Sequence, residues 1–323
     1  MNKLILLFTS LTVFLIGAVA IPLQNTSSSS FPSSSDTQTQ VPADGDNDSW
    51  ETLFSDDFST YAAGSQPSPD KWTIDTGDSY PGGPVGWGTG EIETYTASTD
   101  NLVITPEGRL RLTPQLTNNQ WTSARIETTA AHDFACPAGH KLHIEATIKL
   151  GSGNAQLGIW PAFWALGSDF RSDSQRWPGV GEIDILESVN GAETGYQTVH
   201  CGVAPGGPCS EKTGVSSSTG WSRNAWHTAG VKIDRTNQGG DWKGEKITWL
   251  LDGAKVFSLD GSRINDETAW TALTRNSKFI IFNVAVGGDM PNSLAHQFTP
   301  TGETKGGADA ALEVGKVAVY KTV

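Results

Sequence analysis

The 323-residue chain has few charged side chains and few sulfur-containing ones. Charged residues make up 18% of it, and 35 acidic residues against 22 basic ones give a formal net charge of −13. An acidic surface repels polyphosphate backbones and anionic lipid headgroups. We therefore expect neither nucleic acid nor membrane as a partner.

Cysteine is scarce, and its number is odd. Cys201 and Cys209 flank the turn-rich run Gly-Val-Ala-Pro-Gly-Gly-Pro, which could close as a small disulfide in an oxidising compartment. Cys136 would then remain a free thiol. Neither a C-x-x-C nor an H-E-x-x-H pattern occurs, so we expect no zinc, no other metal and no cofactor.

Long apolar runs are missing except at the N-terminus. There, Lys3 is followed by an apolar stretch over 4–16 and by the small residues Ala-Val-Ala at 18–20. This order is typical of a secretory signal peptide, and the stretch is short for a membrane span. We expect residues 1–20 to be cleaved and the protein to be secreted into the extracellular space, without a lipid anchor.

Residues 21–49 contain Ser, Thr, Gln, Pro and Asp with almost no large apolar side chains. Such a segment cannot bury enough surface to offset its ordering entropy, so it is expected to be a disordered linker open to O-glycosylation. Asn25 and Asn47 each begin an N-x-Ser/Thr sequon and are candidate N-glycosylation sites. A single domain is expected over 50–323.

Short apolar or alternating runs recur along this domain, separated by turn residues, and no window of helical period stands out. This spacing predicts an all-β fold, an antiparallel β-sandwich without internal repeats. The expected strands cover 102–105, 109–113, 143–150, 181–188, 198–201, 228–233, 246–251, 279–286 and 314–320.

Three carboxylates lie in one apolar, β-branched run within residues 177–190. On a strand, Glu182 and Asp184 share a face, whereas strict alternation would turn Glu187 away. One β-bulge between Asp184 and Glu187 would return all three to one face. Retaining glycosidases use two such groups about 5–5.5 Å apart, and like-charge repulsion would keep a proton on one of them. A solvated strand face and a calcium site remain alternatives.

The neighbouring motifs carry a family resemblance. Gly-Glu-Ile-Asp-Ile-Leu-Glu (181–187), preceded by Gly-Ile-Trp-Pro-Ala-Phe-Trp-Ala-Leu-Gly (158–167), closely resembles the family 16 glycoside hydrolases, especially their laminarinase-like fungal branch. Thr-Val-His-Cys-Gly (198–202) and Phe-Asn-Val-Ala-Val-Gly-Gly (282–288) match as well. The resemblance implies a concanavalin-like jelly-roll sandwich of two curved antiparallel sheets, with a glycan across the concave face.

Catalytic roles follow from the resemblance. Glu182 matches the nucleophile, Glu187 the general acid/base and Asp184 the carboxylate between them. Last strands in the family often carry an aspartate that helps to bind calcium, and Gly315 stands in its place here.

Substrate-binding residues also follow from the resemblance. Trp177, Trp160 and Trp164 are candidates for sugar stacking or for core packing, and twelve tryptophans in the chain fit either use. His200 is expected either to donate a hydrogen bond near the catalytic pair or to be a satisfied core histidine. Asn283 and Arg125 match positions that line sugar subsites.

Three departures from the family motifs affect the sugar subsites. Thr89 stands where asparagine is usual, Glu93 where glutamine is usual, and Met290 where a tryptophan is common. The sequence therefore predicts a secreted, monomeric endo-β-glycanase that acts on β-1,3- or mixed β-1,3/1,4-glucan with retention. An endo-β-1,3-galactanase, a cell-wall transglycosylase and a non-catalytic lectin remain alternatives.

Overall fold

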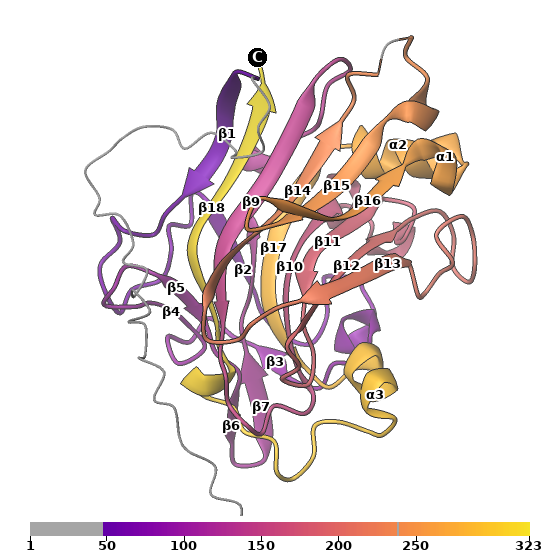
Figure 1. Cartoon of the computed structure of the whole chain (residues 1–323). Coiled ribbons are helices and arrows are strands. Elements are labelled where there is room, and N and C mark those ends of the chain that lie inside the picture. The colour runs from indigo at the N-terminus through magenta and orange to yellow at the C-terminus, as the bar shows by residue number, and fades with distance from the viewer. Residues whose placement is uncertain (1–47, 238) are drawn as a thin grey trace, which may run out of the picture. The chain divides into compact units, whose positions relative to one another are not determined.

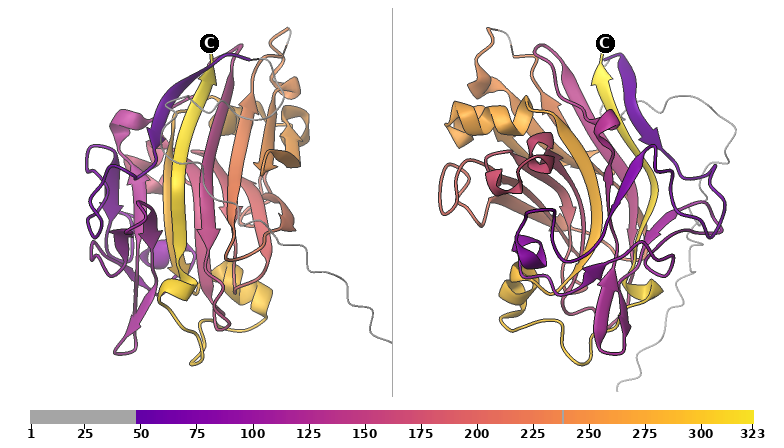
Figure 2. Two further views of the ribbon diagram at one scale, coloured as in Figure 1. Left: turned by 60° about the vertical axis from the view of Figure 1, so that its left-hand side comes forward. Right: turned by 180° about the vertical axis from the view of Figure 1, so that it is seen from behind.

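The computed structural model describes residues 48–237 and 239–323. The expected signal peptide, the linker up to Asn47 and both sequons lie outside these residues. The described part is built from two large antiparallel sheets that lie face to face as two layers (Figures 1 and 2). This architecture is the all-β jelly-roll sandwich that the sequence predicts.

The first sheet has eight strands in the order β16-β15-β14-β9-β18-β5-β4, with β1 paired to β18. In this sheet, β9 pairs antiparallel with β14 on one side and with β18 on the other, along nearly its whole length. Its strands are β1 (Trp50–Asp56), β4 (Leu102–Ile104), β5 (Leu110–Leu112), β9 (Lys141–Leu150), β14 (Trp226–Asp234), β15 (Lys246–Leu251), β16 (Ala254–Asp260) and β18 (Leu312–Thr322).

The second sheet has seven strands in the order β13-β12-β11-β10-β17-β8-β2. A small third sheet, β3-β7-β6, closes one end. The strands of the second and third sheets are β2 (Trp72–Asp75), β3 (Thr94–Tyr95), β6 (Gln115–Thr117), β7 (Gln120–Ser123), β8 (Arg125–Thr128), β10 (Ile159–Gly167), β11 (Glu182–Glu187), β12 (Thr194–His200), β13 (Val215–Gly220) and β17 (Lys278–Val286).

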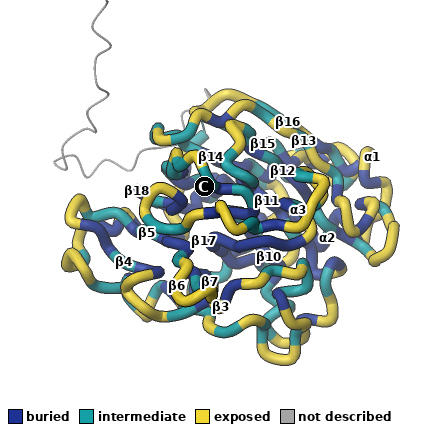
Figure 3. The backbone as a smooth tube through the Cα atoms, turned by 90° about the horizontal axis from the view of Figure 1, so that it is seen from below, coloured by how far each residue is buried: buried dark blue, intermediate teal, exposed yellow. Residues whose placement is uncertain are grey.

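The main hydrophobic core fills the space between the two large sheets. Alternate residues of the facing strands supply it, such as Ile144 and Ile148 of β9 opposite Phe163 of β10 and Phe282 of β17. The central strand β17 is buried along its whole length (Figure 3), because the loop over 168–180 covers part of its outer side. Aliphatic and aromatic side chains suit this two-sided burial.

Three short helices differ from the expectation that no helical segment stands out. The longest, α2 (Glu267–Thr274), begins at Asp266, whose side chain accepts from the backbone N–H of Ala269. This cap satisfies a donor that the first helical turn leaves open. Helices of one or two turns give too few residues for a periodic pattern, and the other two are α1 (Gly261–Ile264) and α3 (Asp289–Ala295).

The cysteines pair as the sequence suggests. Cys201 and Cys209 form a disulfide, and Cys136 is a buried free thiol. Within residues 48–237 and 239–323, no helix combines the length and the hydrophobicity needed to cross a membrane.

Candidate active site

Strand β11 carries all three carboxylates, and it contains the β-bulge that the sequence predicts. Its register with β12 pairs Asp184 with Thr198 and Glu187 with Tyr196, so one extra residue lies between them on β11. Ile183, Ile185 and Leu186 all join the core between the sheets. The bulge thus lets two consecutive residues, Ile185 and Leu186, face inward and returns Glu187 to the face of Glu182 and Asp184.

Two contacts outside the sheet hold β11 in this form. The backbone carbonyl of Asp184 accepts a hydrogen bond of 2.8 Å from the indole Nε1 of Trp249, a fully buried residue of β15 in the opposite sheet. At the start of the strand, Gly181 has a φ of +78°, and a Cβ there would lie 2.4 Å from the carbonyl oxygen of Ala272. Only glycine fits this close approach to α2.

Two of the predicted tryptophans bind the outer carboxylates directly. Trp177 donates from Nε1 to Glu182 Oε2 at 3.1 Å, and Trp160 donates from Nε1 to Glu187 Oε1 at 3.0 Å. Both indoles remain partly exposed. Each therefore orients a carboxylate and still presents ring surface to solvent, where a sugar could stack.

His200 of β12 lies against the other two acids. Its Nε2 is 3.6 Å from Asp184 Oδ2 and 4.0 Å from Glu182 Oε1, and its Nδ1 is 2.8 Å from Glu211 Oε2. This arrangement favours the role near the catalytic pair over that of a core histidine. Trp177 packs on the imidazole, with 5.7 Å between ring centroids.

Burial and mutual repulsion separate the proton affinities of the three acids. Burial, reinforced by the charge of Glu182, raises the pKa of Glu187 to about 7, although His200 and the Trp160 hydrogen bond oppose the rise. Burial and the charges of both glutamates raise the pKa of Asp184 well above its usual value. Burial also raises the pKa of Glu182, against the lowering influence of His200 and Trp177.

His200 supplies positive charge to this acidic cluster. Burial lowers its pKa, but the hydrogen bond to Glu211 and the charges of Glu182 and Asp184 outweigh burial and raise it to about 10. The imidazole is therefore a cation at neutral pH. Neighbouring groups with separated proton affinities are what acid–base chemistry requires.

The other predicted sugar-binding residues continue the site across β10, β17 and β8. Trp164 donates from Nε1 to Asn283 Oδ1 at 2.9 Å, and the guanidinium of Arg125 lies 4.9 Å from the Trp164 ring. Arg125 and Asn283 are only 4% and 5% exposed. Both side chains pair with protein groups, so their direct contact with a sugar stays a prediction.

The spacing of the site would allow a cation. Ligand atoms of Glu182, Asp184 and His200 all lie within 4.8 Å of one another. A cation could bind His200 here only if Nε2 gave up its proton, because a metal needs a lone pair that the imidazolium lacks. The imidazolium itself supplies the positive charge among these acids.

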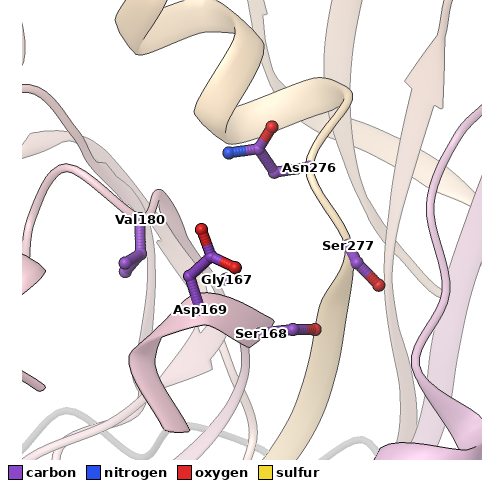
Figure 4. A pocket seen from close by; sticks show the side chains of 6 residues that line it. All are labelled: Gly167, Ser168, Asp169, Val180, Asn276 and Ser277. Carbon is purple, nitrogen blue, oxygen red and sulfur yellow. The ribbon is translucent and has the colours of Figure 1, made fainter. Parts of the chain in front are cut away.

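A separate hollow of about 180 Å³ lies beside Val180 and the ends of β10 and β17 (Figure 4). The carboxylate of Asp169 and the amide of Asn276 point toward the same space, and Asp169 also pairs with Arg176. None of the three carboxylates of β11 lines this hollow. It is therefore not the place where the acidic chemistry of β11 could act.

Sequence reasoning did not predict the support that three residues give the site, although it named Glu93 as a departure from the family motif. Glu211 is buried beneath His200, although it follows Cys209 in a polar turn that looks solvent-exposed in the sequence. Tyr95 is buried and accepts from Asn283 Nδ2 at 3.0 Å. Glu93, in the loop before it, is buried and accepts from the backbone N–H of Val286. Only the disulfide, which brings residue 211 back to β12, could have indicated Glu211.

Comparisons with known proteins agree with this geometry. Residues 94–249 match a family model described as an XgeA-like, catalytic GH16 domain. An endo-1,3-β-glucanase from Streptomyces sioyaensis is 41% identical, with a TM-score of 0.78 over 84% of this chain and 96% of that one. An endo-β-1,3-glucanase from Pyrococcus furiosus is 26% identical, with a TM-score of 0.63 over 86% and 97% of the two chains. A β-glucanase from Rhodothermus marinus is 28% identical over 74% of this chain and 76% of its own length.

Proposed function

Because the chain belongs to glycoside hydrolase family 16, we propose that it is an endo-acting hydrolase of β-1,3- or mixed β-1,3/1,4-glucan that retains the anomeric configuration. Its membership and its likeness to endo-1,3-β-glucanases establish a glycoside hydrolase of the β-glucanase type. The observation that supports the mechanism is that Glu182 and Glu187 share one face of β11 and that Glu187 has a pKa of about 7, which suits a general acid.

The proposed reaction has two steps. Glu182 attacks the anomeric carbon and forms a glycosyl ester, while the glycosidic C–O bond breaks and the leaving oxygen takes the proton of Glu187. Water then attacks the anomeric carbon, gives a proton to Glu187 and releases the Glu182 carboxylate. Burial and the charges of the two glutamates raise the pKa of Asp184, so Asp184 would hold or share a proton and limit the negative charge beside the nucleophile.

Trp160 and Trp177 suit this division of roles. Trp160 donates a hydrogen bond to one oxygen of Glu187, and Trp177 donates one to one oxygen of Glu182, so each indole orients one carboxylate of the pair. Water remains the proposed acceptor of the glycosyl group, and another sugar would make the enzyme a transglycosylase. A lectin would need no such pair of oriented acids.

Incubation with laminarin, lichenan and β-1,3-galactan tests the substrate and the reaction together. We expect laminarin to be shortened to oligosaccharides, with the β-anomer appearing first by NMR. Shortening of β-1,3-galactan alone would contradict the glucanase assignment, and binding without shortening would leave a lectin. Transfer products longer than the starting oligosaccharide would favour the transglycosylase.

The nucleophile assignment has its own control. Glu182→Gln removes the attacking carboxylate but keeps an acceptor for Trp177 Nε1, so we expect folded protein without measurable hydrolysis. Circular dichroism and laminarin hydrolysis measure the two properties separately. An active Glu182→Gln enzyme would remove Glu182 from this role.

The remaining expectations are part of the same proposal. We propose that the chain is secreted after cleavage at residue 20, is glycosylated at Asn25 and Asn47, and acts as a monomer of the laminarinase-like fungal branch. The polysaccharide substrate itself supports an extracellular site of action. Intact-mass measurement before and after deglycosylation, with N-terminal sequencing, tests the processing.

A further inference from the structure

Glu211 is a buried acid to which the reaction outlined above gives no role. It follows the loop that the Cys201–Cys209 disulfide closes, and its backbone exchanges two hydrogen bonds with Gly206, of 2.6 and 2.7 Å. Its side chain has no exposed surface. A carboxylate that is fully removed from water must find its partners inside the protein.

Both oxygens of Glu211 have such partners. Oε1 accepts from the backbone N–H of Cys201 at 2.8 Å, and Oε2 is 2.8 Å from His200 Nδ1. The acceptor fixes a proton on Nδ1 and the plane of the ring. The opposite nitrogen, Nε2, consequently faces Asp184 and Glu182.

Within the described residues, the acids that contact His200 come from β11 and from the turn that holds Glu211. Strand β11 places Glu182 and Asp184 against Nε2, and Glu187 of the same strand acts on the ring through space. The turn after the disulfide-closed loop supplies Glu211 on the other side. Trp177, which carries no charge, covers the ring.

We propose that Glu211 is a positioning residue that keeps His200 a cation with its Nε2–H directed at the nucleophile and its neighbour. The proposal rests on the proposed function, because it gives the imidazolium the task of holding the Glu182 carboxylate ionised. Without a counter-charge on Nδ1, the buried ring would lose its proton in the neutral range. Glu182 would then face Asp184 with no positive charge beside it.

A purely structural role makes a different prediction. If Glu211 only ties its loop to Cys201, its loss lowers activity by the same factor at every pH. If it keeps the imidazole charged, the loss is small where His200 is protonated in any case and grows as the pH rises. The titration of the His200 imidazole and the pH profile of kcat/KM distinguish the structural role of Glu211 from the role that keeps the imidazole charged.

The experiment compares the full chain with Glu211→Gln and with Glu303→Gln, which removes an exposed carboxylate as a matched control. NMR follows the His200 imidazole, assigned by its loss in His200→Asn. We expect the wild-type ring to hold its proton through neutral pH and the Glu211→Gln ring to lose its proton in the neutral range. The kcat/KM on laminarin should fall less than about threefold near pH 5 and at least about tenfold near pH 7.5.

Two outcomes would overturn the proposal. One is a wild-type His200 that titrates near the ordinary histidine value of about 6.5. The other is a Glu211→Gln loss that is equal at both pH values. If the variant does not fold, the wild-type titration alone decides. The titration needs no substrate, so a chain that leaves laminarin intact refutes the proposed function without deciding the role of Glu211.

Discussion

Glu187 is the residue whose proton controls the proposed first step. Its pKa of about 7 means that it holds the proton below neutrality and loses it above. We therefore expect kcat/KM on laminarin to fall about tenfold per pH unit once the pH exceeds about 7. A pH profile of kcat/KM measures this limb, and activity that stays level to about pH 9 would contradict the assignment.

Asp184 is a residue at which function and stability should conflict. Its Oδ2 is buried without a hydrogen-bond partner, and its folded-state pKa lies well above the ordinary value of 3.8. The folded state thus binds the proton more tightly than the unfolded state, so folding loses stability as the pH rises from about 4 toward the folded pKa.

Asp184→Asn should remove this penalty. We expect the variant to be more stable than wild type at neutral pH by at least about 1 kcal/mol, because each tenfold change in proton affinity is worth about 1.4 kcal/mol. Chemical denaturation at about pH 3 and pH 7 checks the sign, since the advantage should vanish at the lower pH. Activity should fall, because the amide introduced in place of the Asp184 carboxyl group cannot hold or share a proton with Glu182 and Glu187 as that carboxyl group can.

At the scale of elements, the bulge of β11 depends on the opposite sheet. Trp249 of β15 donates its indole N–H to the Asp184 carbonyl across the core. Trp249→Phe removes this buried hydrogen bond, so we expect a loss of about 1–3 kcal/mol of stability. Laminarin hydrolysis should also fall, because the position of Glu187 depends on the bulge.

Trp221→Phe is the matched control for this substitution. Trp221 is 2% exposed, and its Nε1 has no hydrogen-bond partner. Its replacement by phenylalanine therefore removes the same atoms without breaking a hydrogen bond. Urea unfolding of both variants measures the difference, and equal losses would show that only core volume matters at Trp249.

At the scale of the whole molecule, the expected domain boundary can be tested by truncation. β1 pairs with β18 from Trp50 onward, so a chain of residues 48–323 keeps every described strand. We expect this chain to unfold at the same temperature as the chain from residue 21 and to hydrolyse laminarin equally well. A lower melting temperature would assign a structural role to residues 21–47.

The sequence determined the strand-rich fold, the bulge and the acids it brings together, because alternation with period two and three carboxylates are local features. It also suggested the disulfide, from two cysteines around a turn-rich loop. Strands such as β8 and β13 escaped notice because they are short or polar, and the helices because they span one or two turns.

Only the tertiary structure decided which groups surround the acids. Glu211 is eleven residues beyond His200, the last residue of β12. It lies against His200 because the chain folds back after the loop that the disulfide closes. Trp249 reaches Asp184 from the other sheet, 65 residues away. The burial that raises the pKa of Glu187 arises from such non-local contacts, and local sequence does not encode them.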